Sequence, residues 1–499
     1  MGGNVSIGSA APDRHNAVGT PLPNRYILQK ATINGVDVLF FSSDPWRKLK
    51  RRIGASKVLD REEDRMVYAV DASYTAPPGN HDPDVVVLPE SVEDTIEAVR
   101  AAADAGVPVI PRGKGTGMSA GSVPIGGGMV IATEKLRRIR EVNVNQRWIQ
   151  CETGLTCEEV KLAAGRHRLF YPPDPSSYRI SSIGGNIAEN AGGLRCVKYG
   201  TTKDYVLGLR YISPDGELIS TGALGYADQP FDLTPLLVGS EGLFGLIVEA
   251  QLGLLPQPKT TRTLLAHFDD PYRAISAIHT ILPELVPSVL EFMDEAVIRA
   301  ISGHDPYPFP EGTRAALLIE TDGDRDDCDR EAARVAEILE EQSALEIHAA
   351  ADISERERLW ELRRLISPSL SRLADGKMNE DVVVPISRLG DLIRACAEIS
   401  EHYDVMIPIY GHAGDGNLHL NGMYNRTDLE AGKRAHDAIL ACFKTVVEMG
   451  GTISGEHGIG ASKNEYMELQ FSEDELEVLR SMKTAFDPLG RFNPKKVLP

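Results

Sequence analysis

"PRGKGTGMS" (Pro111–Ser119) is the stretch that decides the fold of this 499-residue chain. It follows an apolar, strand-like run. Its three glycines allow unusual backbone conformations and expose successive N–H groups that can bind an anion such as a pyrophosphate. A tight surface loop would show the same letters. The spacing matches neither the G-x-x-x-x-G-K-[ST] phosphate loop nor the G-x-G-x-x-G dinucleotide fingerprint.

Two further segments favour the anion-binding interpretation. "PPDPSSYRISSIGGNIAENAGG" (Pro172–Gly193) combines prolines, hydroxyls and glycines, and "GSEGLFGLIVEA" (Gly239–Ala250) leads into another strand-like run. Three glycine-rich loops in one domain are hard to explain as independent turns.

Composition limits the class of protein. A chain of this length is too long for one hydrophobic core, so roughly two or three domains are expected. A formal net charge of −19 argues against nucleic acid as a partner, which needs clustered Lys and Arg. No apolar run is long enough to span a membrane. The six cysteines contain no C-x-x-C pair, which excludes a zinc ribbon and a four-cysteine iron–sulfur run and predicts reduced thiols in a cytoplasmic protein.

Residues 1–60 predict an extension with one hairpin-like segment (Val36–Phe41) and a basic helix, "RKLKRR" (Arg47–Arg52). The leader matches the Met-Gly-x-x-x-Ser pattern of myristoylation, but no polybasic stretch lies beside it, so we interpret it as disordered.

From Asp82 onwards strands and helices alternate, which is typical of an α/β layout. "SVEDTIEAVRAAADAG" predicts a helix that Ser91 caps, with Asp94 completing a capping box and Gly106 ending it. Further on, 206–221 predicts a hairpin turned at Asp215-Gly216.

Pro256 and Pro258 mark a domain boundary. Beyond it, the strands 263–268 and 315–320, the helix after Pro271 and the helix 326–342 predict an antiparallel sheet covered by helices.

The second half contains "YGHAGDGNLHLNG" (Tyr410–Gly422). A short glycine-rich turn can fold His412 back beside His419, and "SGEHGIG" supplies Glu456 as a third ligand for a first-row divalent ion. A hydrogen-bonded loop without metal is the alternative. On "ERERLWELRRLISPSL", helical spacing puts Trp360 and Arg363 on one face with Ser367.

The order and wording of these motifs resemble the vanillyl-alcohol-oxidase-type, or p-cresol-methylhydroxylase-type, FAD-binding fold. Within it the chain is similar to D-lactate dehydrogenases, the glycolate oxidase catalytic subunit and D-2-hydroxyglutarate dehydrogenases, over about residues 60–499. The resemblance implies an α+β protein with an N-terminal extension (1–60), a FAD-binding domain of two subdomains (61–257), a ferredoxin-like cap or substrate domain (258–465), and a C-terminal segment that returns to the FAD domain (466–499).

The resemblance also implies FAD as cofactor, with its pyrophosphate on the first glycine loop and the other loops along the flavin. Some relatives attach FAD to a histidine where this chain has Thr116, so we expect non-covalent FAD. Lys114 replaces a common glycine. The implied FAD-binding residues are Pro111, Arg112, Gly113, Lys114, Gly115, Thr116, Gly117, Met118, Ser119, Asp174, Ser182, Gly184, Gly185, Asn190, Glu241, Gly245, Ile247 and Asn493.

In the relatives, G-H-x-G-D-G-N-L-H and G-E-H-G-I-G together bind a divalent metal and the substrate. The metal ligands implied here are His412, His419 and Glu456, with Zn²⁺ preferred over Mn²⁺ or Fe²⁺. The implied catalytic residues are His457 as general base, Arg363 as carboxylate clamp, and Asn421, Ser367 and Trp360 as further contacts.

The chain is therefore expected to oxidise a D-2-hydroxy acid to the 2-oxo acid by hydride transfer to flavin. D-lactate is the first candidate substrate and glycolate the second. D-2-hydroxyglutarate is disfavoured because Asn379 replaces a lysine of some dicarboxylate-specific relatives, although Lys377 is near. The expected electron acceptor is an iron–sulfur subunit, an electron-transfer flavoprotein, a cytochrome or a quinone.

A homodimer and peripheral membrane association through a partner are further expectations. Two other classes stay open: a metal-dependent hydrolase that binds a nucleotide substrate, and a non-catalytic flavin-binding subunit of a redox complex.

Overall fold

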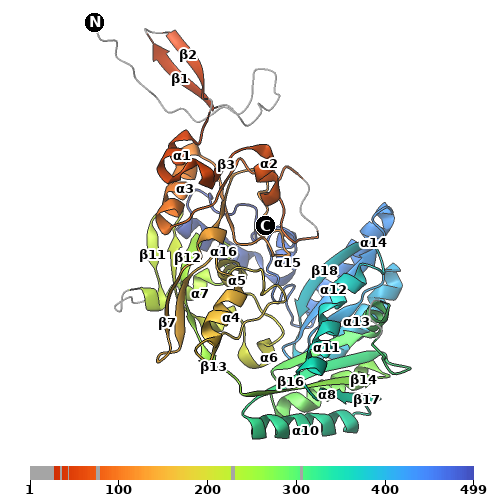
Figure 1. The fold of residues 1–499 in the computed structure, drawn as a ribbon. Coiled ribbons are helices and arrows are strands. Elements are labelled where there is room, and N and C mark those ends of the chain that lie inside the picture. The colour runs from red at the N-terminus through yellow and green to blue at the C-terminus, as the bar shows by residue number, and fades with distance from the viewer. Residues whose placement is uncertain (1–26, 34–35, 43, 75–78, 226–230, 304–306) are drawn as a thin grey trace.

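The computed structural model describes residues 27–33, 36–42, 44–74, 79–225, 231–303 and 307–499. The leader and its lipidation pattern lie outside these residues. The first elements are the hairpin β1 (Ile27–Ile33) and β2 (Val36–Ser42), followed by the basic helix α1 (Arg47–Ile53) (Figure 1). Trp46, Leu49 and Ile53 belong to the same core as the first sheet, so the chain from residue 44 on packs with that sheet rather than extending from it.

The first sheet has four strands in the order β3-β4-β6-β5, and β4, β6 and β5 are parallel. Its strands are β3 (Val58–Leu59), β4 (Val85–Val87), β5 (Val109–Arg112) and β6 (Met129–Ala132). The continuous apolar run of β4 is fully buried, as parallel strands covered on both faces require.

Helix α3 (Val92–Ala105) joins β4 to β5 and begins and ends as predicted. The Ser91 side chain accepts a hydrogen bond from the Asp94 amide, and Gly106 takes the left-handed conformation. The predicted capping box is wrong, because the Asp94 carboxylate accepts from the Glu90 amide (3.0 Å) and from Lys57 Nζ (2.6 Å) instead.

The second sheet is antiparallel, in the order β11-β10-β12-β8-β7. Its strands are β7 (Ile139–Asn143), β8 (Trp148–Glu152), β10 (Val206–Ile212), β11 (Leu218–Ser220) and β12 (Leu246–Gly253). β10 and β11 form the predicted hairpin. Helices α4 (Cys157–Gly165), α5 (Ile183–Glu189) and α7 (Thr234–Leu237) pack against this sheet and cover one face of its core.

The third sheet has seven antiparallel strands in the order β17-β14-β16-β15-β19-β20-β18. They are β14 (Thr260–Phe268), β15 (Val289–Asp294), β16 (Ala315–Gly323), β17 (Glu346–Ala349), β18 (Gly376–Val383), β19 (Ile409–His412) and β20 (Asn417–Tyr424). The predicted helices are α8 (Pro271–Glu284) and α10 (Arg325–Glu341), so the expected antiparallel sheet with helices is confirmed.

This sheet consists of two halves with the same strand order. Along the chain β14, α8, β15, β16, α10 and β17 form a ferredoxin-like unit whose fourth strand lies beside the first. β18, α13 (Leu389–Tyr403), β19, β20 and α14 (Leu429–Glu448) repeat the order, and a bridge from Val383 to Thr452 stands where a fourth strand would lie. The halves meet where β15 pairs with β19.

Alternation of side chains gives the third sheet two different faces. One buries apolar residues such as Leu317 and Leu420 against α8, α10, α13 and α14. The other carries Glu291, His412 and His419 toward the FAD-binding half. Cross-strand register places Glu291 opposite His412, and Asp381 opposite His419.

A network of buried charges joins the two halves of the molecule. Arg195, just before α6 (Cys196–Tyr199), contacts Asp174 (3.1 Å) and reaches across to Glu320 (3.1 Å) and Asp322 (3.4 Å) on β16. The Trp360 indole also donates to Glu320 (2.7 Å), which ties the helix that carries Arg363 to the same network.

The C-terminal segment packs on the first two sheets, where Figure 1 shows α16 (Glu473–Phe486). The Asn493 amide donates to the backbone carbonyl of Glu241 (2.6 Å), and Lys496 Nζ donates to that of Val123 (2.8 Å). The domain limits at 60, 257 and 465 stay predictions. None of the described helices is long and apolar enough to cross a membrane.

We expect Arg195→Met to destabilise the protein by about 3–5 kcal/mol, because it removes one cation from three buried carboxylates. Differential scanning calorimetry should show a lower unfolding temperature. Arg273→Met, at an exposed pair with Asp269, is the matched control and should leave it unchanged. Equal unfolding temperatures for Arg195→Met and wild type would contradict this role for the network.

Candidate active site

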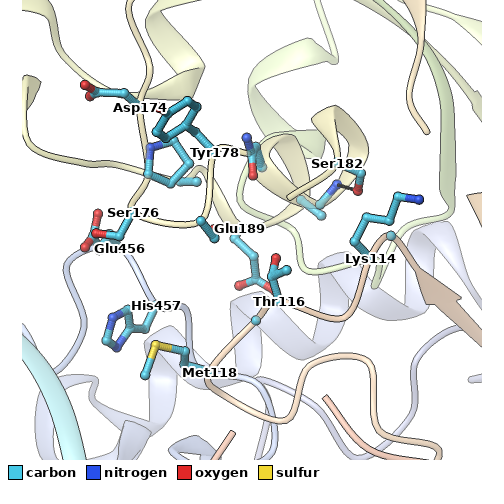
Figure 2. Close-up of a pocket in the computed structure, with 18 of the residues that line it drawn as sticks. Lys114, Thr116, Met118, Asp174, Ser176, Tyr178, Ser182, Glu189, Glu456 and His457 are labelled. Atoms are coloured by element: carbon cyan, nitrogen blue, oxygen red, sulfur yellow. Dashed lines mark hydrogen bonds between the residues drawn. The ribbon is translucent and has the colours of Figure 1, made fainter. Parts of the chain in front are cut away.

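A cavity of about 820 Å³ runs between the FAD-binding half and the third sheet. Its walls come from the three glycine-rich loops, from the helix that carries Trp360 and Arg363, and from the loop of Glu456 and His457. Figure 2 shows the first two glycine-rich loops facing Glu456 and His457. Ligand cavities are typically about 300–1,000 Å³, so this one has room for a large cofactor and a small substrate together.

The first loop forms a cradle that only glycine permits. Gly115 has φ of +67°, and a Cβ there would lie 2.6 Å from Cζ of Arg112. A Cβ on Gly113 would collide with the Ser182 hydroxyl, which caps α5 by accepting from the Gly185 amide (3.2 Å). Backbone and helix N-terminus thus face one space from two sides, which suits a pyrophosphate.

The predicted FAD-binding residues line this cavity except Ser119 and Asn190. Ser119 is buried behind the loop, where its carbonyl accepts from the Ala461 amide (2.9 Å). Asn190 ends α5 in the left-handed conformation, and its side chain accepts from the Lys203 amide (2.9 Å). Both residues shape the loops without reaching the cavity wall. This set of residues and space fits FAD.

His412, His419 and Glu456 come together as predicted, with one ligand atom from each within 4.8 Å of the others. Nε2 of His412 lies 3.2 Å, and Nε2 of His419 3.6 Å, from Oε1 of Glu456. His412 ends β19 and His419 lies in β20, so the tight turn between the strands brings the two imidazoles together.

The donor set fits a divalent metal ion. Within the described residues, Oε2 of Glu456 and Nδ1 of His419 are buried without a hydrogen-bond partner. Burial and the neighbouring imidazoles of His457 and His412 lower the pKa of His419 well below its ordinary value, which keeps it neutral, as a ligand must be. Two imidazoles and one carboxylate are a common ligand set of catalytic zinc.

Glu291, which the sequence analysis missed, orients two of these groups at once. One carboxylate oxygen hydrogen-bonds Nδ1 of His412, and the other accepts from Nε of Arg363 at 2.5 Å. Although burial opposes it, the Arg363 guanidinium and the hydrogen-bonded ring of His412 lower the pKa of Glu291 to about 2. A carboxylate behind a ligating histidine fixes the ring and its tautomer. A lone acid within the apolar run "VLEFM" was the available signal.

His457 is held by Asp381, a second residue that the sequence analysis missed. Nδ1 of His457 lies 3.2 Å from the Asp381 carboxylate, which also accepts from the amides of Gly455 and Glu456 (both 2.6 Å). Despite its burial, His457 and then Lys463 hold the pKa of Asp381 well below its ordinary value. The ring of His457 lines the cavity and stacks on His419, with centroids 5.2 Å apart.

Trp360, Arg363 and Ser367 all line the cavity. The sequence predicts one helix for all three residues, but the structure divides them between two helices. α11 (Ile353–Arg364) stops and α12 (Ile366–Leu370) begins after Leu365, because Pro368 has no N–H to bond the carbonyl four residues back. The Arg363 guanidinium lies 4.9 Å from the centre of the Tyr410 ring. Because Nε of Arg363 donates to Glu291, the Nη groups of Arg363 remain to bind a carboxylate.

Asn421 is fully buried, and its amide donates to the backbone carbonyls of Pro408 (3.2 Å) and His419 (3.3 Å). In the described part of the chain, Asn421 does not line the cavity, whereas its cross-strand neighbour Asn379 does.

The comparisons with known proteins agree with this fold. Residues 83–222 match the family described as FAD binding domain, and residues 257–497 match FAD linked oxidases, C-terminal domain. The structure of p-cresol methylhydroxylase with substrate bound superposes with a TM-score of 0.76 over 91% of this chain and 96% of that one, at 14% identity. Fold and family models together define a FAD-linked oxidoreductase.

The relatives are more specific. Glycolate oxidase subunit GlcD of Bacillus subtilis is 35% identical over 88% of this chain and 93% of that protein. The D-lactate dehydrogenase of Archaeoglobus fulgidus is 33% identical (83% and 91%), and the D-2-hydroxyglutarate dehydrogenase of Stutzerimonas stutzeri 31% (90% and 98%). The chain belongs to the FAD-linked oxidase family that these proteins represent, which confirms the resemblance and excludes the hydrolase alternative.

We expect Gly115→Ala to weaken FAD binding, because the left-handed φ of +67° strains alanine and the new Cβ would displace the Arg112 guanidinium from the loop. The measurement is the ratio of flavin to protein absorbance after reconstitution. Gly165→Ala is the control, since no heavy atom lies within 4 Å of a Cβ there. Full FAD content in Gly115→Ala would contradict the assignment of this loop.

Proposed function

We propose that this protein is a FAD- and divalent-metal-dependent dehydrogenase that oxidises a 2-hydroxy acid to the 2-oxo acid, with D-lactate as first candidate. One observation carries the proposal: a single cavity connects the glycine cradle to the side chains of Arg363, His419, Glu456 and His457.

Each end of the cavity suits one part of the reaction. Bound FAD would supply the hydride acceptor, and a metal on His412, His419 and Glu456 would supply a Lewis acid. The Nη groups of Arg363 would bind the substrate carboxylate in a bidentate manner and orient C2. Glu291 holds this guanidinium in place.

His457 is our candidate for the general base. Asp381 binds its Nδ1, so Nε2 can accept the hydroxyl proton as C2 loses its hydride. Asp381 also stabilises the protonated imidazole. Together the proton and the hydride account for conversion of the alcohol to the ketone.

The presence of Asn379 rather than Lys377 in the cavity wall favours a monocarboxylate over 2-hydroxyglutarate. Lys377 donates to the Ser367 hydroxyl (3.0 Å) and lies over the Tyr74 ring (4.7 Å from its centre). In the part of the chain that the structure describes, Lys377 does not line the cavity, whereas Asn379 does. A second substrate carboxylate would therefore meet an amide rather than an ammonium group.

We further propose that the electrons leave for a protein acceptor or a quinone. The six cysteines contain no C-x-x-C pair that would suggest an iron–sulfur cluster within this chain. The D configuration, a homodimer and a cytoplasmic or membrane-peripheral location stay predictions from the resemblance.

The deciding experiment is anaerobic addition of D-lactate to FAD-reconstituted protein, followed by flavin absorbance, with L-lactate, glycolate and D-2-hydroxyglutarate in parallel. We expect D-lactate to bleach the flavin and L-lactate to leave it oxidised. EDTA should abolish bleaching, and Zn²⁺, Mn²⁺ or Fe²⁺ added singly should identify the ion that restores it.

Bleaching that persists after complete metal removal would sink the metal-dependent mechanism. Reduction by glycolate or D-2-hydroxyglutarate alone would move the substrate and leave the reaction class intact. A bound flavin that no hydroxy acid reduces would favour the non-catalytic subunit.

We expect Arg363→Lys to raise KM about 10–100-fold, because the loss of a charge-assisted hydrogen bond costs about 1.5–3 kcal/mol. Lysine keeps a positive charge for Glu291 and lacks only the planar fork. Steady-state kinetics of the reducing substrate make the measurement. Arg330→Met, on the exposed face of α10, should leave KM unchanged, and an unchanged KM in Arg363→Lys as well would refute the clamp.

A further inference from the structure

Glu189 is a carboxylic side chain in the cavity wall that no step above uses. It is the last residue of α5, and its carboxyl points toward the turn of the first glycine loop at Thr116 (Figure 2). Its Oε1 lies 3.9 Å from the Cβ position that Gly117 leaves empty and 3.1 Å from that of Gly121. Glu189 therefore faces the stretch of cavity that the cofactor would fill.

The other carboxyl oxygen lacks a partner. Oε2 of Glu189 is buried and has no hydrogen-bond partner within the described parts of the chain. Because Oε2 is enclosed against Gly458, Oε1 is the carboxyl oxygen that faces the cavity, beside Gly117 and Gly121.

A second acid, Glu241, lies beside Glu189 at Gly458. A Cβ on Gly458 would collide with Oε2 of Glu189 and would lie only 3.0 Å from Oε1 of Glu241. Glu241 accepts from the amides of Ile459 and Gly460, each at 2.7 Å, which stabilises its charged form. Two neighbouring carboxyls, one buried (Glu241) and one half-buried (Glu189), do not both ionise readily, so Glu189 is the one that retains the proton.

The surrounding charges support this assignment. Burial, followed by the carboxylates of Glu241, Asp71 and Asp381, raises the pKa of Glu189 well above its ordinary value. The nearby cations are bound elsewhere: Lys463 Nζ lies 2.8 Å from Asp381, and Lys496 Nζ donates to the Val123 carbonyl. A cofactor in the cavity would complete the burial of the Glu189 carboxyl.

We propose that Glu189 is a cofactor-binding residue that acts as a neutral acid and donates its O–H to an acceptor atom of bound FAD. In this form it adds no negative charge beside the pyrophosphate. The inference depends on FAD binding alone and not on the substrate or the metal.

This role predicts how affinity depends on pH. A hydrogen bond from Glu189 to FAD would raise its pKa in the complex above its value in the apoprotein, so FAD affinity is highest below the apoprotein value and falls as the pH rises through the value in the complex. FAD affinity should therefore fall as the pH rises. Glu189→Gln, which donates a hydrogen bond at every pH, should lose this dependence.

The test is FAD titration of apoprotein, followed by flavin fluorescence from acidic to alkaline pH. We expect wild type and Glu340→Gln, an exposed control on α10, to weaken with rising pH. Glu189→Gln should bind at all pH values about as tightly as wild type does at low pH. Glu189→Leu should bind about three- to tenfold more weakly than wild type at low pH, as the loss of one hydrogen bond implies.

A pH dependence in Glu189→Gln equal to that of wild type would overturn the proposal. So would tighter binding by Glu189→Gln than by wild type at low pH, because that would mean that Glu189 is charged there. Should Glu189→Leu fail to fold, the comparison of wild type with Glu189→Gln still decides.

Discussion

The active site depends on one buried carboxylate more than on any other group. Glu291 bonds His412 with one oxygen and Arg363 with the other, so it sets the orientation of a candidate metal ligand and of the candidate substrate clamp together. Its charge is compatible with complete burial only because a guanidinium and an imidazole flank it. The spacing between the candidate clamp and the candidate metal ligands therefore depends on the strand β15, which carries Glu291.

Buried ion pairs also connect the two halves of the molecule. Arg195 contacts the loop of Asp174 on the flavin side and β16 on the other, while Trp360 binds the carboxylate of Glu320 in the same cluster. Cofactor loops and substrate helix are thus held by one set of ion pairs. Because both walls of the cavity depend on it, the relative position of flavin and substrate is a property of the whole chain.

Much of this arrangement could be predicted from the sequence. The glycine cradle was visible because only glycine tolerates its backbone conformation, and His412 and His419 because four residues of turn leave two strand ends little choice. The roles of Glu291, Asp381 and Glu189 depend on partners far away in the chain that meet them only through sheet register and domain packing, and only Glu291 carried a sequence signal, its lone charge within an apolar run. The sequence does not reveal the break at Leu365, because helical periodicity continues across it. Nor does it reveal that the Asn421 side chain donates to backbone carbonyls while Asn379 lines the cavity.

The repeated strand order of the third sheet has a consequence for what its two halves contribute. In the first half, Glu320 and Asp322 on β16 form ion pairs with Arg195 of the FAD-binding half. In the second half, the corresponding strand β20 carries His419 at the reactive centre. The same structural unit therefore contributes differently in its two copies. The first supplies the ion pairs to the FAD-binding half on β16 and the supporting carboxylate Glu291 on β15, and the second supplies the candidate metal ligands His412 and His419.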